Sequence, residues 1–186
     1  MKNIAIISPS VRTGRNSHRI ALYLENLIRE NGLASVEILD LLRYNFPLFN
    51  ERLKYQDPPL KEAVDFAERI RTADGIVIVS PEYNGGSPAS LKNAVDLLVE
   101  EWNKKPVAFA TVSDGMFAGT QAIISLQFSL SKLGAIIVPS VMRLPNIDKS
   151  FDENGIPADK HKTDKRGIAF LKELLWFIEA KDRMAG

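Results

Sequence analysis

Three short segments combine hydroxyl, glycine, amide and basic residues in a pattern typical of ligand-binding loops. The first is residues 8–18, which reads SPSVRTGRNSH and runs directly into an amphipathic helical segment. A helix start offers unpaired N–H groups and the positive end of the helix dipole, both of which favour phosphate. Because Arg12 and Arg15 add charge-assisted donors, we predict a phosphate site. The alternative is a solvated turn in which Ser17 only caps the helix.

The other two segments are rich in glycine. Residues 80–88 read SPEYNGGSP, and the adjacent glycines allow the backbone to approach a flat ligand closely. Tyr83 could stack on such a ligand or bind it, but Glu82 and Asn84 could equally serve as caps in an ordinary turn. Residues 113–120 read SDGMFAGT, where the glycine spacing permits a backbone cradle, although this signal alone is weak.

The surrounding elements alternate between short apolar runs and helical patterns. The apolar runs predict strands at 4–7, 36–39, 76–79, 107–112 and 135–138. The helical patterns cover 17–31, 59–72, 88–102, 121–133 and 164–180, with Ser87 as N-cap and Pro88 at the first helical position of the third helix. This order predicts an α/β fold whose parallel sheet is covered on both faces.

Ligands of open parallel sheets bind beyond the carboxyl ends of the strands, where the strand order reverses. The three polar segments follow the first, third and fourth strands, so we expect them at one edge of the sheet. Two further stretches, 41–58 and 144–163, are long for connections in such a fold. They are either surface or intersubunit excursions or lids over a site, and the sequence leaves this open.

Composition excludes several classes of protein. The chain has 186 residues, a net charge of +1, two histidines and no cysteine. Disulfide scaffolds, thiolate nucleophiles and thiolate metal sites are therefore excluded, and the charge does not resemble that of a duplex-binding protein. Without a signal-peptide pattern or a membrane-length apolar run, we expect a cytoplasmic protein with no metal, nucleic-acid or membrane partner.

The segments together resemble the NADPH-dependent FMN reductase family. The most specific match is P-E-Y-N-G at 81–85, which continues as S-P-A-S-L-K-N-A-V-D at 87–96. Ser10, Arg12 and Ser17 also match the family pattern after the first strand, and the similarity continues to about Gly155. The resemblance implies a single flavodoxin-like domain over 1–186, a three-layer sandwich with strand order 2-1-3-4-5.

The resemblance also implies FMN as cofactor and NAD(P)H as electron donor. Hydride would reach the flavin without a side-chain acid–base pair, while N–H groups from Tyr83 to Gly86 stabilise charge near the ring. The resemblance implies no catalytic side chain and places Tyr83, Asn84 and Gly85 beside the ring. The implied cofactor-binding residues are Ser10, Arg12, Arg15, Asn16, Ser17, His18, Pro81, Glu82, Tyr83, Asn84, Gly85, Ser113, Gly115 and Gly119.

The second substrate implied by the resemblance is a small acceptor: a flavin, quinone, azo compound or oxidised metal ion. The resemblance also implies a homodimer or homotetramer, and the aromatic stretch 44–55 is a candidate for its interface. The chain departs from the family pattern at Asp114, Ala118, Gln121 and Gln127. These departures concern the acceptor and the subunit contacts more than FMN binding.

Other functions remain open at this point. A flavodoxin-type electron shuttle or a flavin-binding regulator would share the fold without oxidising NAD(P)H. A serine hydrolase would use Ser87 with Asp148 and His161, but its nucleophile should follow the strand directly. A receiver domain would need an acidic pocket that the segments after the first and third strands do not supply.

Overall fold

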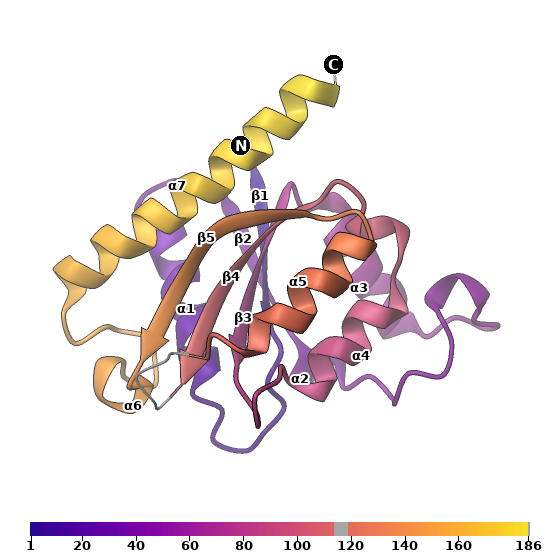
Figure 1. The fold of residues 1–186 in the computed structure, drawn as a ribbon, viewed down its shortest axis with the longest axis horizontal. Helices are drawn as coiled ribbons and strands as arrows, with labels where there is room; N and C mark the ends of the chain where they lie inside the picture. The colour runs from indigo at the N-terminus through magenta and orange to yellow at the C-terminus, as the bar shows by residue number, and fades with distance from the viewer. Residues whose placement is uncertain (114–118, 186) are drawn as a thin grey trace.

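The chain folds around one five-stranded parallel sheet. A computed structural model describes residues 1–113 and 119–185. The strand order is β2-β1-β3-β4-β5, which confirms the predicted flavodoxin-like topology (Figure 1). The strands are β1 (Asn3–Ser8), β2 (Ser35–Asp40), β3 (Gly75–Pro81), β4 (Pro106–Ser113) and β5 (Ile136–Pro145).

Helices cover both faces of the sheet and complete a three-layer sandwich (Figure 1). One face packs against α1 (Ser17–Glu30) and α7 (Lys160–Ala185), and the other against α3 (Lys61–Thr72), α4 (Ala89–Leu97) and α5 (Ala122–Lys132). Successive strand residues alternate between the two cores: Ile4 and Ile6 belong to one, Ala5 and Ile7 to the other. Burial on both faces explains the uninterrupted apolar runs. No helix in the described part of the chain is long and apolar enough to cross a membrane.

The fifth strand is longer than predicted. It extends to Pro145 rather than ending at Val138, and its pairing with β4 shifts in register between Val107 and Phe109. The added residues include the exposed Pro139, which an edge strand tolerates because it needs no N–H on its open side. The apolar-run criterion failed here because an edge strand is not buried along its whole length.

The predicted helix 88–102 is also divided. It begins at Ala89, with Pro88 in the cap position and no side-chain cap bond, so the prediction that Ser87 caps it is wrong. It ends at Leu97, and Trp102 lies on the separate short helix η2 (Glu100–Trp102). The Trp102 indole still donates to the Val95 carbonyl over 3.2 Å. The helical periodicity predicted too long a helix because Trp102, although it lies beyond the end of α4, is buried on the same side as the inner face of that helix.

The two long connections contain short helical turns. The first holds α2 (Leu41–Tyr44) and η1 (Leu53–Tyr55), and the second holds α6 (Ile147–Ser150). Asn93 on α4 holds the first connection by two hydrogen bonds. Its side-chain amide N–H donates to the Pro47 carbonyl over 2.8 Å, and its amide oxygen accepts from the Phe49 N–H over 2.5 Å. The intervening Leu48 is 87% exposed. The first connection is therefore attached to the helix that follows the glycine-rich segment.

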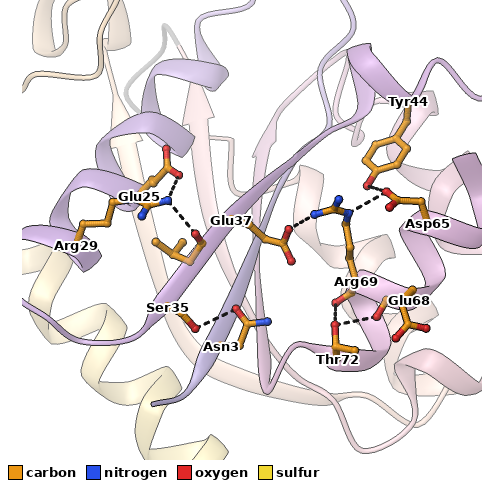
Figure 2. Close-up of polar contacts among 11 residues, drawn as sticks. Asn3, Glu25, Arg29, Ser35, Glu37, Tyr44, Asp65, Glu68, Arg69 and Thr72 are labelled. Carbon is orange, nitrogen blue, oxygen red and sulfur yellow. Dashed lines mark hydrogen bonds and ion pairs between the residues drawn. The ribbon is translucent and has the colours of Figure 1, made fainter.

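A polar network joins β2 to α3 at the edge of the sheet. Figure 2 shows Arg69 between Glu37 and Asp65, with Tyr44 donating to the same Asp65 carboxylate. The Arg69–Asp65 contact measures 2.8 Å and the Tyr44–Asp65 contact 2.7 Å. The side chains of Arg69, Glu37 and Asp65 are 44%, 29% and 49% exposed, so these surface ion pairs contribute little to stability.

Candidate cofactor-binding site

The parallel register brings the three polar segments to one edge of the sheet. Ile7 of β1 pairs with Ile78 of β3, and Pro81 pairs with Val112 of β4, so the following loops emerge side by side. They enclose a pocket of about 260 Å³. Its lining residues are Ser10, Arg12, Gly14, Arg15, Asn16, Ser17, Pro81, Glu82, Tyr83, Val112, Ser113, Ile147 and Asp148. Two larger hollows, of about 520 and 620 Å³, lie along α3 and beneath 47–62, away from the three loops.

The first and second loops are joined by direct hydrogen bonds. The hydroxyls of Ser10 and Tyr83 lie 2.6 Å apart, and the Ser10 side chain is fully buried. Ser90, in the first turn of α4, donates to the Pro9 carbonyl over 2.6 Å. These contacts fix the position of the first loop relative to the glycine-rich turn.

Arg15 is occupied within the protein. Its guanidinium forms a two-pronged ion pair with Asp40, with 2.7 Å between Nη2 and Oδ2, and also donates to the Ser10 carbonyl over 3.2 Å. Burial raises the pKa of Asp40, but hydrogen bonds from Arg15 and from the Leu42 N–H outweigh it, so that the pKa lies below its ordinary value. Asp40 is therefore ionised and offsets the Arg15 charge.

Asn16 and His18 also have partners. The Asn16 amide donates to Asp148 on α6, and His18 Nδ1 lies 2.9 Å from the Ser8 hydroxyl. Burial, followed by the nearby charge of Arg15, lowers the pKa of His18 below 6.5. The imidazole is thus neutral at neutral pH and adds no positive charge to the pocket.

Arg12 and Ser17 are the predicted phosphate ligands that the structure leaves available. Within the described part of the chain, the exposed Arg12 guanidinium forms no ion pair or hydrogen bond. Ser17 is 3% exposed, and its hydroxyl has no hydrogen-bond partner among the described residues. The N-cap position of α1 belongs to Asn16, so the interpretation of Ser17 as a simple cap is wrong. A buried hydroxyl without a partner is costly, and an anionic ligand at the helix start would satisfy it.

The glycine-rich segment forms a two-residue hairpin turn. The N–H of Tyr83 donates to the Gly86 carbonyl over 2.8 Å, and the N–H of Gly86 donates to the Tyr83 carbonyl over 3.0 Å. Asn84 and Gly85 occupy the centre of the turn with φ of 52° and 79°, as an Asn-Gly type I′ turn requires. The expected row of four N–H donors is therefore reduced to those of Asn84 and Gly85.

The second loop is also attached to the third. A Glu82 carboxylate oxygen accepts the backbone N–H of Gln121, at the start of α5, over 3.1 Å. Glu82 thus has the capping role that the sequence offered as an alternative.

Within the third segment, 113–120, the structure describes Ser113, Gly119 and Thr120. Gly119 has φ of 70°, and a Cβ there would lie 3.1 Å from the Val112 carbonyl oxygen. Gly115 lies outside the described residues, as do the departures at Asp114 and Ala118. Of the other two departures, Gln121 has an exposed side chain and Gln127 a half-buried one.

The sequence did not assign two carboxylates, Asp40 and Asp148, to the cofactor site. Asp40 ends β2 and holds Arg15, while Asp148 on α6 lines the pocket beside Asn16. Asp40 could have been found by applying the strand-end rule to the second strand, whereas nothing local distinguishes Asp148. Because Asp148 contacts Asn16 and Arg19, the hydrolase role considered for it has no structural support.

A parallel sheet in this order, with a polar helix start beside a glycine-rich turn, defines a flavodoxin-like protein. The NADPH-dependent FMN reductase family model matches residues 2–148, and the chain therefore belongs to that family.

Curated relatives and solved structures agree with this assignment. A quinone reductase of Pseudomonas putida KT2440 is 33% identical over 134 residues, which cover 69% of each protein. The NAD(P)H-dependent FMN reductase LOT6 of Saccharomyces cerevisiae is 30% identical over 151 residues, 74% of this chain and 78% of the relative. The flavoenzyme NAD(P)H:acceptor oxidoreductase FerB of Paracoccus denitrificans has the same fold, with a TM-score of 0.77, 20% identity, and coverage of 96% and 98%. The chain is an oxidoreductase that uses FMN and NAD(P)H.

The turn at 83–86 provides a first test. Proline holds φ at about −65°, so Gly85→Pro cannot adopt the native backbone, and we expect FMN affinity to fall at least about tenfold. Gly86→Ala is the matched control, because its Cβ would lie 3.7 Å from the Tyr83 oxygen, an ordinary contact. Quenching of flavin fluorescence measures both. Unchanged FMN affinity and NAD(P)H oxidation in Gly85→Pro would refute the role of this turn.

His18 provides a test by pH. Its folded pKa lies below the ordinary 6.5, so the unfolded chain takes up the proton first as the pH falls. The contribution of this pKa difference to the free energy of unfolding is fully present above pH 6.5. It is lost progressively as the pH falls to the folded pKa. We expect the free energy of unfolding in urea to fall less between about pH 8 and about pH 5 for His18→Gln than for the unaltered protein. Equal declines would contradict the neutral state of His18.

Proposed function

We propose that this chain reduces a quinone or a similar flat small acceptor with electrons from NAD(P)H, through FMN held by the three loops. The observation that carries the proposal is that Ser17 and Arg12 line one pocket and that, among the described residues, the buried Ser17 hydroxyl has no hydrogen-bond partner and the Arg12 guanidinium has no ion pair. A phosphate dianion satisfies both groups. The quinone reductase among the relatives supports the acceptor class, and the single sheet supports one FMN-binding domain over 1–186.

The residues divide into ligand-binding and loop-shaping groups. Arg12 and Ser17 would hold the phosphate at the start of α1, while Pro81, Tyr83 and the turn at 84–85 would lie along the ring. Ser113 and Gly119 would border the opposite side of the ring. Ser10, Arg15, Asn16, His18 and Glu82 contact other protein groups and shape the loops.

The chain supplies binding and electrostatics rather than acid–base chemistry. When bound, FMN supplies the two-electron chemistry between donor and acceptor. The N–H groups of Asn84 and Gly85 are the donors that the turn leaves for negative charge at the ring edge. Their positions are set by the turn before any ligand binds, so no reorganisation is required.

The deciding experiment is stopped-flow mixing of FMN-loaded protein with NADPH or NADH, followed at the flavin absorbance band. We expect rapid loss of absorbance, with the ratio of the two rates identifying the preferred donor, and reoxidation by added quinone. Tight FMN binding without bleaching would instead identify an electron shuttle or a flavin-binding regulator. Failure to bind FMN would overturn the proposal.

We further propose a cytoplasmic homodimer or homotetramer. Ile124 and Phe128 lie one turn apart on α5 and are 61% and 71% exposed. Large apolar side chains grouped on a surface are typical of contact sites. In equilibrium sedimentation we expect the unaltered protein to be oligomeric and Phe128→Glu to dissociate. Ile156→Glu, at a 56% exposed position in the connection after β5, is the control expected to stay assembled. A fully active monomer would contradict the proposal.

A further inference from the structure

Two consecutive residues just before α1, Arg15 and Asn16, are bound by carboxylates that lie at opposite edges of the sheet. Asp40, at the end of edge strand β2, binds Arg15, and Asp148, just beyond edge strand β5, binds Asn16. The Arg15 pair is the more buried: the side chains of Arg15 and Asp40 are 16% and 4% exposed. Arginine presents a planar fork that matches both carboxylate oxygens, which lysine cannot reproduce.

The same guanidinium also acts on the first loop. It donates to the carbonyl of Ser10, whose hydroxyl contacts Tyr83. Asp40, Arg15, Ser10 and Tyr83 thus form a continuous chain of contacts from β2 to the glycine-rich turn. This chain sets the loop conformation before any ligand binds, and such preorganisation lowers the cost of binding.

Pairing also decides which arginine can act on a ligand. Since Asp40 offsets the Arg15 charge and His18 is neutral, Arg12 is the unpaired cation among the described pocket-lining residues. An arginine engaged at both Nη atoms cannot turn toward a phosphate without breaking a buried ion pair.

We propose that Asp40 is a positioning residue for cofactor binding: through Arg15 it fixes the phosphate loop, and it leaves Arg12 as the arginine that binds the phosphate. This inference rests on the proposed FMN site. It assigns Arg15 a bracing role instead of the direct phosphate contact suggested by its place in the loop.

The test compares FMN with riboflavin, which lacks the phosphate, by quenching of flavin fluorescence. Arg15→Lys keeps the positive charge but loses the fork. We expect it to weaken FMN binding about tenfold and riboflavin binding by less, so that the ratio of FMN to riboflavin affinity falls. Arg12→Ala should weaken FMN binding at least as much and reduce its dependence on salt. Asp40→Asn should weaken FMN binding like Arg15→Lys, and the double variant should lose no more than either single variant.

Arg69→Lys is the matched control. Arg69 also contacts two carboxylates, Asp65 and Glu37, but none of these residues lines the pocket (Figure 2). We expect its ratio of FMN to riboflavin affinity to equal that of the unaltered protein.

Amide hydrogen exchange in FMN-free protein separates this inference from the proposed function. We expect residues 10–16 to exchange faster in Arg15→Lys than in the unaltered protein or Arg69→Lys. An Arg15→Lys protein with unchanged exchange and an unchanged affinity ratio would overturn the inference. Tighter FMN binding by Asp40→Asn would also overturn it, because it would mean that the released Arg15 binds phosphate. Faster exchange in a protein that never binds FMN would support the brace and refute the cofactor site instead.

Discussion

The parallel pairing of β3 with β1 on one side and β4 on the other is the interaction on which the site depends. Parallel strands end at the same edge of a sheet, so this pairing alone places three loops side by side although they are far apart in the sequence. Both faces of these strands are covered, and a shift in register would move their side chains from one core to the other. The position of the loops is thus set by the burial of apolar side chains well away from them.

Short polar contacts then convert three neighbouring loops into one surface. Ser10 joins Tyr83, Ser90 joins Pro9, and Glu82 joins the start of α5. Each such bond contributes only about 1 kcal/mol to stability, but together they restrict loop movement. A family that relies on a bound cofactor for its chemistry needs this arrangement, because the protein's part is to position the cofactor.

Charge in the pocket is set by pairing rather than by composition. The first loop carries two arginines and a histidine, yet Asp40 offsets one arginine and burial keeps the histidine neutral. Arg12 and the Ser17 hydroxyl remain available beside a helix N-terminus. Among the described residues, an anion in this pocket would therefore meet the Arg12 charge and the Ser17 hydroxyl at a helix N-terminus.

Much of this protein was determined by the sequence alone. Apolar runs and helical periodicity predicted the sheet, its covering helices and the shared edge, and the motif beginning at Pro81 identified the family, because these signals depend on neighbouring residues. Tertiary structure decided which loop side chains are available to a ligand. Arg15 meets Asp40 across 25 positions and Asn16 meets Asp148 across 132, and no local pattern encodes such contacts. The ends of β5 and α4 also depend on tertiary packing. The exposure of the edge strand and the burial of Trp102 beyond the end of α4 are not encoded in the sequence pattern.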